Sequence, residues 1–147
     1  EHNLTYDLLI FAKQLPQSIE LVKQLPNLSI VVDHIAKPDI VNHSDFDAWK
    51  AGMEKLASFE NVMCKVSGLV TEADVNNWQI DDFKQYLDVV FKAFGPNRIM
   101  FGSDWPVCLL GGDYLEIKNI VDRYVNQYYA EYTDEIYGGN AAKFYQL

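Results

Sequence analysis

Basic residues are scarce in this sequence, and long hydrophobic runs are absent. Twelve Lys and Arg residues stand against 21 Asp and Glu, which gives a formal net charge of −9. Because neutralising phosphates requires clustered Lys and Arg, this balance excludes nucleic acid and an anionic membrane surface as partners. No apolar run approaches the roughly 18 residues of a membrane span, and no basic-then-apolar leader opens the chain. We therefore expect a cytoplasmic protein.

The motifs that usually mark metal and nucleotide sites are also missing. Cys64 and Cys108 lie far apart and in no CxxC spacing, so we exclude a zinc ribbon and expect two free thiols rather than a disulfide. His2, His34 and His43 form no HxH or HExxH pattern, so a metal site built from this chain alone would be short of ligands. No GxGxxG or GxxxxGK[ST] fingerprint of a nucleotide fold occurs.

The chain does contain a regular alternation of strand-like and helix-like segments. Apolar, β-branched runs predict strands at 5–11, 28–33, 61–67 and 98–101. Helical periodicity and capping residues predict helices at 16–25, 44–58, 80–94 and 115–125, and a last helical segment at 133–145 that breaks at Gly138-Gly139. Glu1 to Leu4 resemble the end of a helix, with Asn3 available for the left-handed cap position.

This order predicts an α/β fold with a parallel sheet. At 147 residues and 49% hydrophobic composition, we expect one domain that spans residues 1–147. Four βα units are too few to close a (β/α)8 barrel, which takes roughly 250 residues. Two architectures therefore remain open, a small open doubly wound sheet and about half of a barrel.

Two of the predicted strands end in residues that can carry chemistry. His34 directly follows the second strand, and Asp104 follows the fourth strand after two small residues. Because right-handed crossovers bring all carboxyl ends to one side, His34 and Asp104 should face each other across one rim. Asp104 could ligate a metal or take a proton from water, but an Asp that caps a turn is an equally good interpretation. His34 could be a metal ligand, a carbonyl polariser, or a half-buried imidazole.

Three further residues lie in loops of the same presumed rim. Lys37, Glu72 and Trp105 could line a substrate pocket there. For each of the two charged residues, a solvated loop position is the more common explanation.

Five longer motifs are distributed over nearly the whole chain. They are Leu4–Leu9, Val32–Pro38, Cys64–Asp74, Phe94–Cys108 and Tyr137–Ala141. In this order they resemble the amidohydrolase-related (amidohydrolase 2) TIM-barrel hydrolases, and within them the sugar lactonases of the L-fuconolactonase and L-rhamnonolactonase type.

The resemblance implies the C-terminal half of a (β/α)8 TIM barrel, about strands 4/5 to 8 plus a terminal helix. It places His34 after strand 5 and Asp104 after strand 8, and it implies a divalent metal, Zn²⁺ being the expected ion, with these two residues as ligands. The family's HxH pair after strand 1 is missing here. Because Cys64–Ser67 holds no histidine where strand 6 is expected, a mononuclear or metal-free site is favoured over a two-metal site.

The implied reaction is hydrolysis of a sugar lactone. Asp104 would activate the water, His34 or the metal would polarise the carbonyl, and Lys37, Glu72 and Trp105 would contact the substrate. Lacking the HxH half, the chain alone is expected to be inert. Two unpaired sheet edges and an uncovered inner face predict that it associates with the missing N-terminal half or with itself.

Two alternatives stay open. The first is a decarboxylase or another hydrolase of the same superfamily. The second is a non-catalytic α/β binding or assembly domain that is complete at this length.

Overall fold

The protein forms a four-stranded parallel sheet with helices on both faces. We describe residues 4–147 from a computed structural model, so the helix end expected at Glu1 to Asn3 lies outside the described residues. The strands are β1 (Tyr6–Leu8), β2 (Ile30–Val32), β3 (Val62–Val66) and β4 (Ile99–Phe101). They pair in chain order, all in parallel. A doubly wound sheet reverses its strand order at a switch point, so this unbroken order favours a segment of a barrel.

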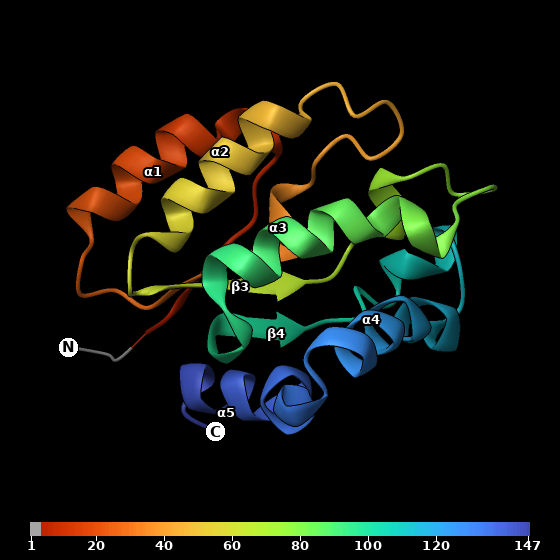
Figure 1. Cartoon of the computed structure of the whole chain (residues 1–147). Helices are drawn as coiled ribbons and strands as arrows, with labels where there is room; N and C mark the ends of the chain where they lie inside the picture. The colour runs from red at the N-terminus through yellow and green to blue at the C-terminus, as the bar shows by residue number, and fades with distance from the viewer. Residues whose placement is uncertain (1–3) are drawn as a thin grey trace.

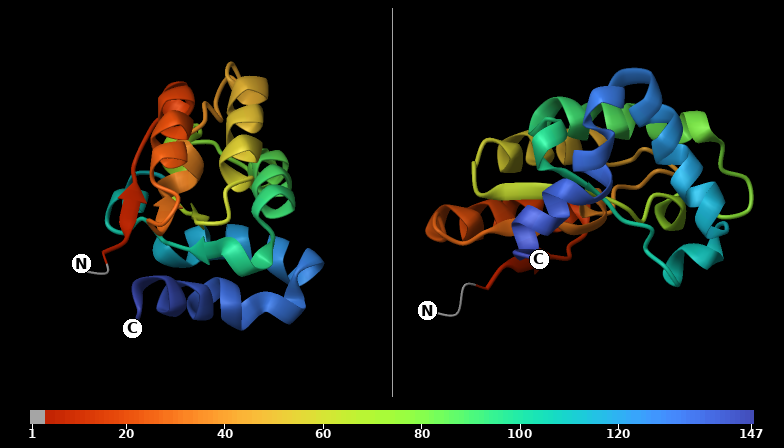
Figure 2. Two further views of the ribbon diagram at one scale, coloured as in Figure 1. Left: turned by 90° about the vertical axis from the view of Figure 1, so that its left-hand side faces the viewer. Right: turned by 90° about the horizontal axis from the view of Figure 1, so that it is seen from below.

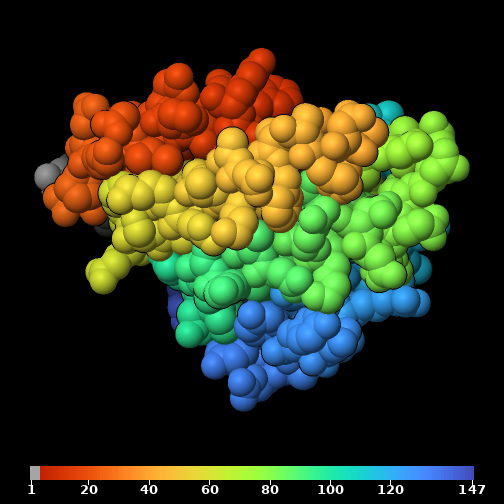
Figure 3. All heavy atoms as spheres, turned by 45° about the horizontal axis from the view of Figure 1, so that its top comes forward, coloured from red at the N-terminus to blue at the C-terminus, as the bar shows by residue number. Residues whose placement is uncertain are grey.

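The helices are α1 (Leu15–Gln24), α2 (Phe46–Ala57), α3 (Lys84–Phe94), α4 (Tyr114–Tyr128) and α5 (Asn140–Tyr145). Helices α1, α2 and α3 lie side by side on one face of the sheet, like the outer ring of a barrel (Figures 1 and 2). In the space-filling view, successive units form adjacent bands that follow the chain from red to blue (Figure 3).

Local sequence explains where these helices begin and end. Pro16 occupies the first turn of α1, and Asp113 forms a capping box with Glu116 at the start of α4. Gly95, with a φ of 72°, ends α3. The predicted break at Gly138-Gly139 is wrong, because a π-helical turn over Glu135–Gly139 runs directly into α5.

Side chains of the strands divide between two hydrophobic cores. Val62, Cys64 and Val66 alternate toward the helices and join the larger core, whose largest side chains include Trp49 and Tyr86. The second core lies on the inner face of the sheet; it consists of Val31, Met100 and Phe144, with Met63, Ala141 and Tyr145 packed against it. Helix α5 therefore covers Val31 and Met100, and the expectation of an uncovered inner face is wrong at this place.

Polar contacts fasten α5 across this inner face. Asn140 is 2% exposed, and its Nδ2 donates to the carbonyl oxygens of Pro96 and Ile99, each at 2.8 Å. The Tyr145 hydroxyl donates to Asp7 Oδ2 at 2.7 Å, and Lys65 Nζ contacts the same carboxylate. The last helix is thus bonded to the first strand.

Large apolar side chains remain exposed near both ends of the sheet. Leu4, Tyr6, Leu9 and Phe11 lie in or next to β1, and Trp105, Val107, Leu109, Leu110, Tyr114 and Leu115 lie in the segment from the loop after β4 to the first turn of α4. Cys64 and Cys108 are both buried and free, so the prediction of two free thiols is confirmed, and burial raises the pKa of each. Within residues 4–147, no helix is long and apolar enough to cross a membrane.

Candidate active site at the carboxyl ends of the strands

The structure brings His34 and Asp104 together at the rim where the strands end. His34 follows β2 and Asp104 follows β4, and His34 Nε2 lies 3.7 Å from Asp104 Oδ1. Their side chains are 17% and 12% exposed. This separation is too long for a hydrogen bond, so the two groups face each other across a narrow gap.

The backbone at both residues adopts the left-handed conformation. His34 has a φ of 51° and Asp104 a φ of 59°, and the φ values of Ile35, Ala36 and Lys37 also lie between 46° and 60°. This conformation costs roughly 1 to 2 kcal/mol for a residue with a Cβ. Such strain persists where the surrounding structure imposes it, and it gathers at functional sites.

A residue that the sequence analysis did not single out also contacts the site. Ser67 is 3% exposed, and its Oγ lies 2.8 Å from His34 Nδ1. Gly68, with a φ of 62°, packs directly against the same ring, because a Cβ there would lie 2.9 Å from His34 Cβ, Cγ and Nδ1. Glycine is therefore required beside His34. The available signal for Ser67 was its place at the carboxyl end of the third predicted strand, 61–67.

Asp104 has one oxygen without a partner. Its Oδ2 is buried and makes no hydrogen bond within the described part of the chain. A buried carboxylate oxygen is costly to leave unpaired, so it is a natural acceptor for a proton, a water molecule or a cation.

The donors fit part of a metal site. His34 Nε2 and Asp104 offer one imidazole nitrogen and one carboxylate, both usual zinc ligands. Among residues 4–147, no group of three or more His, Cys, Asp or Glu side chains could hold an ion. A complete coordination sphere would need ligands from elsewhere.

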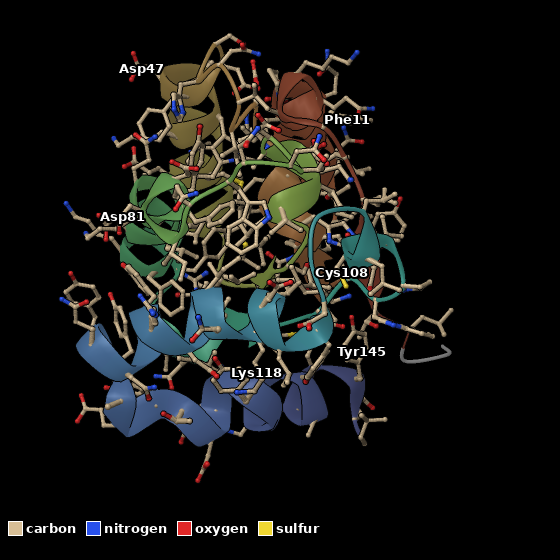
Figure 4. All side chains as sticks on the ribbon, turned by 90° about the vertical axis from the view of Figure 1, so that its right-hand side faces the viewer. Phe11, Asp47, Asp81, Cys108, Lys118 and Tyr145 are labelled. Carbon is tan, nitrogen blue, oxygen red and sulfur yellow. The ribbon has the colours of Figure 1, made fainter. Side chains whose placement is uncertain are left out.

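A cavity of about 370 Å³ lies in the loops that follow β1, β2 and β3, at the same rim of the sheet, and neither His34 nor Asp104 is among its lining residues. Lys37 and Glu72 both line it and form an ion pair, with Nζ and Oε1 2.8 Å apart. The Lys37 ammonium also lies 5.7 Å from the centre of the Phe11 ring. Trp105 is 66% exposed and is not among the lining residues. Figure 4 views the molecule from this rim, where the loops that hold Phe11 and Cys108 lie on one side.

The sheet changes one detail of the barrel numbering. A single strand, β3, separates the strand before His34 from the strand before Asp104. If Asp104 follows the eighth strand of a barrel, His34 follows the sixth and not the fifth. Cys64–Ser67 then belongs to the seventh strand, so its lack of a histidine no longer bears on the number of metal ions.

Comparison with known proteins gives matches along the whole chain. The family model described as Amidohydrolase matches residues 1–147. An L-fucono-1,5-lactonase of Burkholderia multivorans is 37% identical over 155 residues, which cover 99% of this chain and 52% of the relative. An L-fucono-1,5-lactonase of Burkholderia ambifaria is 34% identical, with 99% of this chain and 51% of the relative covered.

A solved structure matches equally well. The crystal structure of an amidohydrolase from Burkholderia multivorans with bound zinc has a TM-score of 0.91 and 39% sequence identity. The match covers 97% of this chain and 52% of that one. The chain thus spans about half the length of the relatives it matches, and the predicted α/β half-barrel is confirmed.

Proposed function

Because this chain belongs to the amidohydrolase family, we propose that it is part of a hydrolase that opens a sugar lactone at the ester C–O bond. The observation that carries the proposal is the His34–Asp104 pair, 3.7 Å apart at the carboxyl ends of the strands. Parallel α/β enzymes bind substrate at this rim. The two L-fucono-1,5-lactonases that match nearly the whole chain support a lactone as the substrate.

In the proposed reaction, Asp104 is the general base. Its buried Oδ2 has no hydrogen-bond partner among the described residues and is free to take a proton from water. The resulting hydroxide adds to the lactone carbonyl carbon, while His34 Nε2, or the cation that it would hold, polarises the carbonyl oxygen. When the ring C–O bond breaks, the protonated Asp104 returns its proton to the departing alkoxide.

We propose a divalent metal, Zn²⁺ being the expected ion, as cofactor. His34 and Asp104 would hold it, together with ligands from outside the described residues. Such an ion supplies positive charge that polarises a carbonyl and lowers the pKa of a nearby water. The relative from Burkholderia multivorans that was crystallised with zinc supports this assignment.

The charges of the cavity favour an uncharged substrate. Its lining contains the ammonium groups of Lys13 and Lys37 and the carboxylates of Asp39, Asp45 and Glu72. A hydrogen bond from the Ser44 side chain lowers the pKa of Asp39, which keeps this carboxylate ionised. The charges of Lys37 and Glu72 cancel each other, and Lys13, Asp39 and Asp45 leave a net negative charge in the lining. This negative charge would repel an anionic substrate. We propose that the pair binds sugar hydroxyl groups.

This charge balance separates the lactonase from the first alternative. A decarboxylase acts on a carboxylate, which the surplus of acidic groups in the cavity would repel.

Trp105, the third residue proposed to bind substrate, exposes a large aromatic ring at the same rim. Such rings stack on the apolar face of a sugar, so we propose that Trp105 covers the bound lactone.

We propose that residues 1–147 are a single partial domain, the C-terminal half of a barrel that is inert by itself. Support comes from the half-length coverage of both lactonases and from the incomplete ligand set. The proposed partner is the N-terminal half of the barrel. Self-association is the expected substitute when that half is absent.

Asp104→Asn tests the function in protein expressed from the complete reading frame. We expect turnover of neutral sugar lactones to fall at least about a hundredfold, the usual contribution of a general base, with an unchanged melting temperature. Asp81→Asn, which alters an exposed carboxylate, is the matched control and should leave turnover unchanged. Full activity of the Asp104 variant, or faster turnover of dicarboxylates than of lactones, would contradict the proposal.

A further inference from the structure

A cluster of polar side chains lies on the inner face of the sheet, one residue from the candidate site. Val31 and Met63 are partners in the pairing of β2 with β3, so the residues two positions further on, Asp33 and Lys65, lie side by side on the same face. Lys65 Nζ is 2.8 Å from Asp33 Oδ1 and 2.5 Å from Asp7 Oδ2. The mechanism above gives this cluster no role.

The cluster reaches the residue at which the left-handed turn begins. Asp33 directly precedes His34, and the four consecutive residues 34–37 all have a positive φ. Backbone of this kind persists only where surrounding contacts hold it. Within the turn, the Lys37 N–H donates to the His34 carbonyl oxygen at 2.9 Å. The His34 side chain therefore keeps its direction toward Asp104 only while this turn keeps its shape.

The Asp33 carboxylate depends on Lys65. The Asp33 side chain is 14% exposed and its Oδ1 is buried, and no group in the described part of the chain makes a well-directed hydrogen bond to that oxygen. The nearby ammonium of Lys65 is the charge that compensates its desolvation. Without this ammonium, the carboxylates of Asp33 and Asp7 would repel each other, and Asp33 would turn toward water. Such a movement would displace the backbone where the turn begins.

We propose that Lys65 is a positioning residue, which pairs with Asp33, fixes the start of the left-handed turn and so sets the direction of the His34 ring. The inference rests on the proposed function, in which His34 acts on the lactone carbonyl directly or through the cation that it would hold. On its other side, Lys65 is held by Asp7, which also accepts the hydrogen bond from Tyr145 of α5. The docked last helix thus supports the site as well.

Amide hydrogen exchange tests the inference in this chain, without metal or substrate. Lys65→Met removes the charge and keeps an apolar stem of similar length. We expect exchange of the Lys37 N–H, whose bond closes the turn, to become at least about tenfold faster, because removing one partner of an ion pair leaves the other uncompensated. The Trp49 N–H donates to the Asp45 carbonyl oxygen at 2.8 Å, reports on the rest of the fold, and should change little.

Two further variants separate the charge from the bulk of the side chain. Lys65→Arg keeps the charge and should return the exchange rate of the Lys37 N–H most of the way to that of the wild type. Asp33→Asn removes the other partner and should act like Lys65→Met. The double variant should exchange no faster than either single variant, because both changes remove the same interaction.

Lys118 provides a matched control. Its Nζ pairs with Asp122 at 2.6 Å and lies 4.6 Å from the centre of the Tyr137 ring, and the Tyr137 hydroxyl donates to the same carboxylate. This is the same combination of lysine, aspartate and tyrosine as in the inner-face cluster, placed away from the left-handed turn. Lys118→Met should therefore leave the exchange of the Lys37 N–H unchanged.

In protein from the complete reading frame, Lys65→Met should lower kcat for the lactone about ten- to a hundredfold with little change in KM, since a misplacement of about 1 Å can cost about a hundredfold. Lys65→Arg should recover most of the loss, and Lys118→Met should have no effect on kcat.

Two results would overturn the inference. One is a Lys37 exchange rate that stays unchanged in both Lys65→Met and Asp33→Asn, and the other is a rise no greater than that of the Trp49 N–H. If Lys65→Met does not fold, Asp33→Asn decides. Exchange is measured without turnover, so the role of Lys65 in holding the turn is decided even if Asp104→Asn refutes the proposed function.

Discussion

Gly68 shows how closely single residues constrain this site. Two features oppose a side chain at this position: the positive φ of 62° and the contact with the His34 ring. Gly95 also has a positive φ, but no atom lies within 4 Å of a Cβ built there. We expect Gly95→Ala to lower the free energy of unfolding by about 1 to 3 kcal/mol, because its φ of 72° and ψ of 158° lie in a backbone region that is essentially restricted to glycine. Gly68→Ala should cost about 1 to 3 kcal/mol more, because the ring must shift.

Urea denaturation of both variants measures this difference. The His34 ¹⁵N signals should change in Gly68→Ala and stay unchanged in Gly95→Ala. Equal costs for the two substitutions would mean that the ring moves aside freely, which would contradict a tightly held imidazole.

Sequence reasoning located His34 and Asp104 because each follows a predictable strand. Sequence reasoning did not identify Ser67, because its contact with His34 joins residues 33 positions apart and a lone serine forms no distinctive pattern. It also did not predict the left-handed backbone that runs from His34 to Lys37. Ile35 and Lys37 are not residues that favour positive φ, so their conformation comes from the tertiary packing around them.

Among the elements, α5 depends on one buried amide. Asn140→Ala leaves the carbonyl oxygens of Pro96 and Ile99 without their shared donor. We expect a loss of about 2 to 6 kcal/mol in the free energy of unfolding, since each of the two unpaired carbonyl groups costs about 1 to 3 kcal/mol. Amide hydrogen exchange should show α5 losing protection before α1.

The control for this variant is Asn126→Ala, which changes an exposed side chain on α4. It should be neutral or slightly stabilising, because alanine favours helix more than asparagine does. Equal effects of the two variants would show that the Asn140 bonds do not hold the helix.

Periodicity predicted the four strands and the five main helical segments. It predicted the first and last residues of these elements less accurately. The first strand was expected at 5–11 and forms at Tyr6–Leu8, because its neighbour β2 offers pairing over only three residues. The last helix was expected to break at two glycines. Instead, Tyr137 packs on Phe101 at 5.0 Å between ring centres, and this contact with β4 outweighs the low helix propensity of glycine.

At the scale of the whole molecule, the exposed leucines predict association of the isolated chain. Leu110 and Leu115 are each 71% exposed, and they belong to a segment with four more exposed large apolar side chains, Trp105, Val107, Leu109 and Tyr114; large exposed apolar surfaces promote association. We expect sedimentation to show concentration-dependent self-association that Leu110→Lys with Leu115→Lys reduces. Leu21→Lys, on the outer surface of α1 and 38% exposed, should have little effect.

Addition of the N-terminal half of the barrel should suppress this association and dye binding to the exposed apolar surface. A monodisperse, inactive monomer would instead favour the alternative of a complete binding or assembly domain. An active monomer would contradict the half-barrel proposal itself.

The long motifs predicted the fold class, but not how α5 docks. Its residues Phe144 and Tyr145 cover part of the inner face that strand and helix patterns left open. Periodicity describes which side of a helix is buried, and it carries no information on which distant surface buries it. That pairing depends on contacts between the two ends of the sequence.

The hydrogen bond between Tyr145 and Asp7 can form only after both residues have been synthesised, which takes a definite time on the ribosome. The two residues are 138 positions apart. A ribosome that adds about 5 to 20 residues per second needs about 7 to 28 seconds to cover that interval. During this time β1 leaves the ribosome and can pair with β2. The carboxylate of Asp7 still lacks the hydrogen bond from Tyr145. A nascent-chain binding factor would therefore find this part of the inner face of the sheet open until α5 has been made.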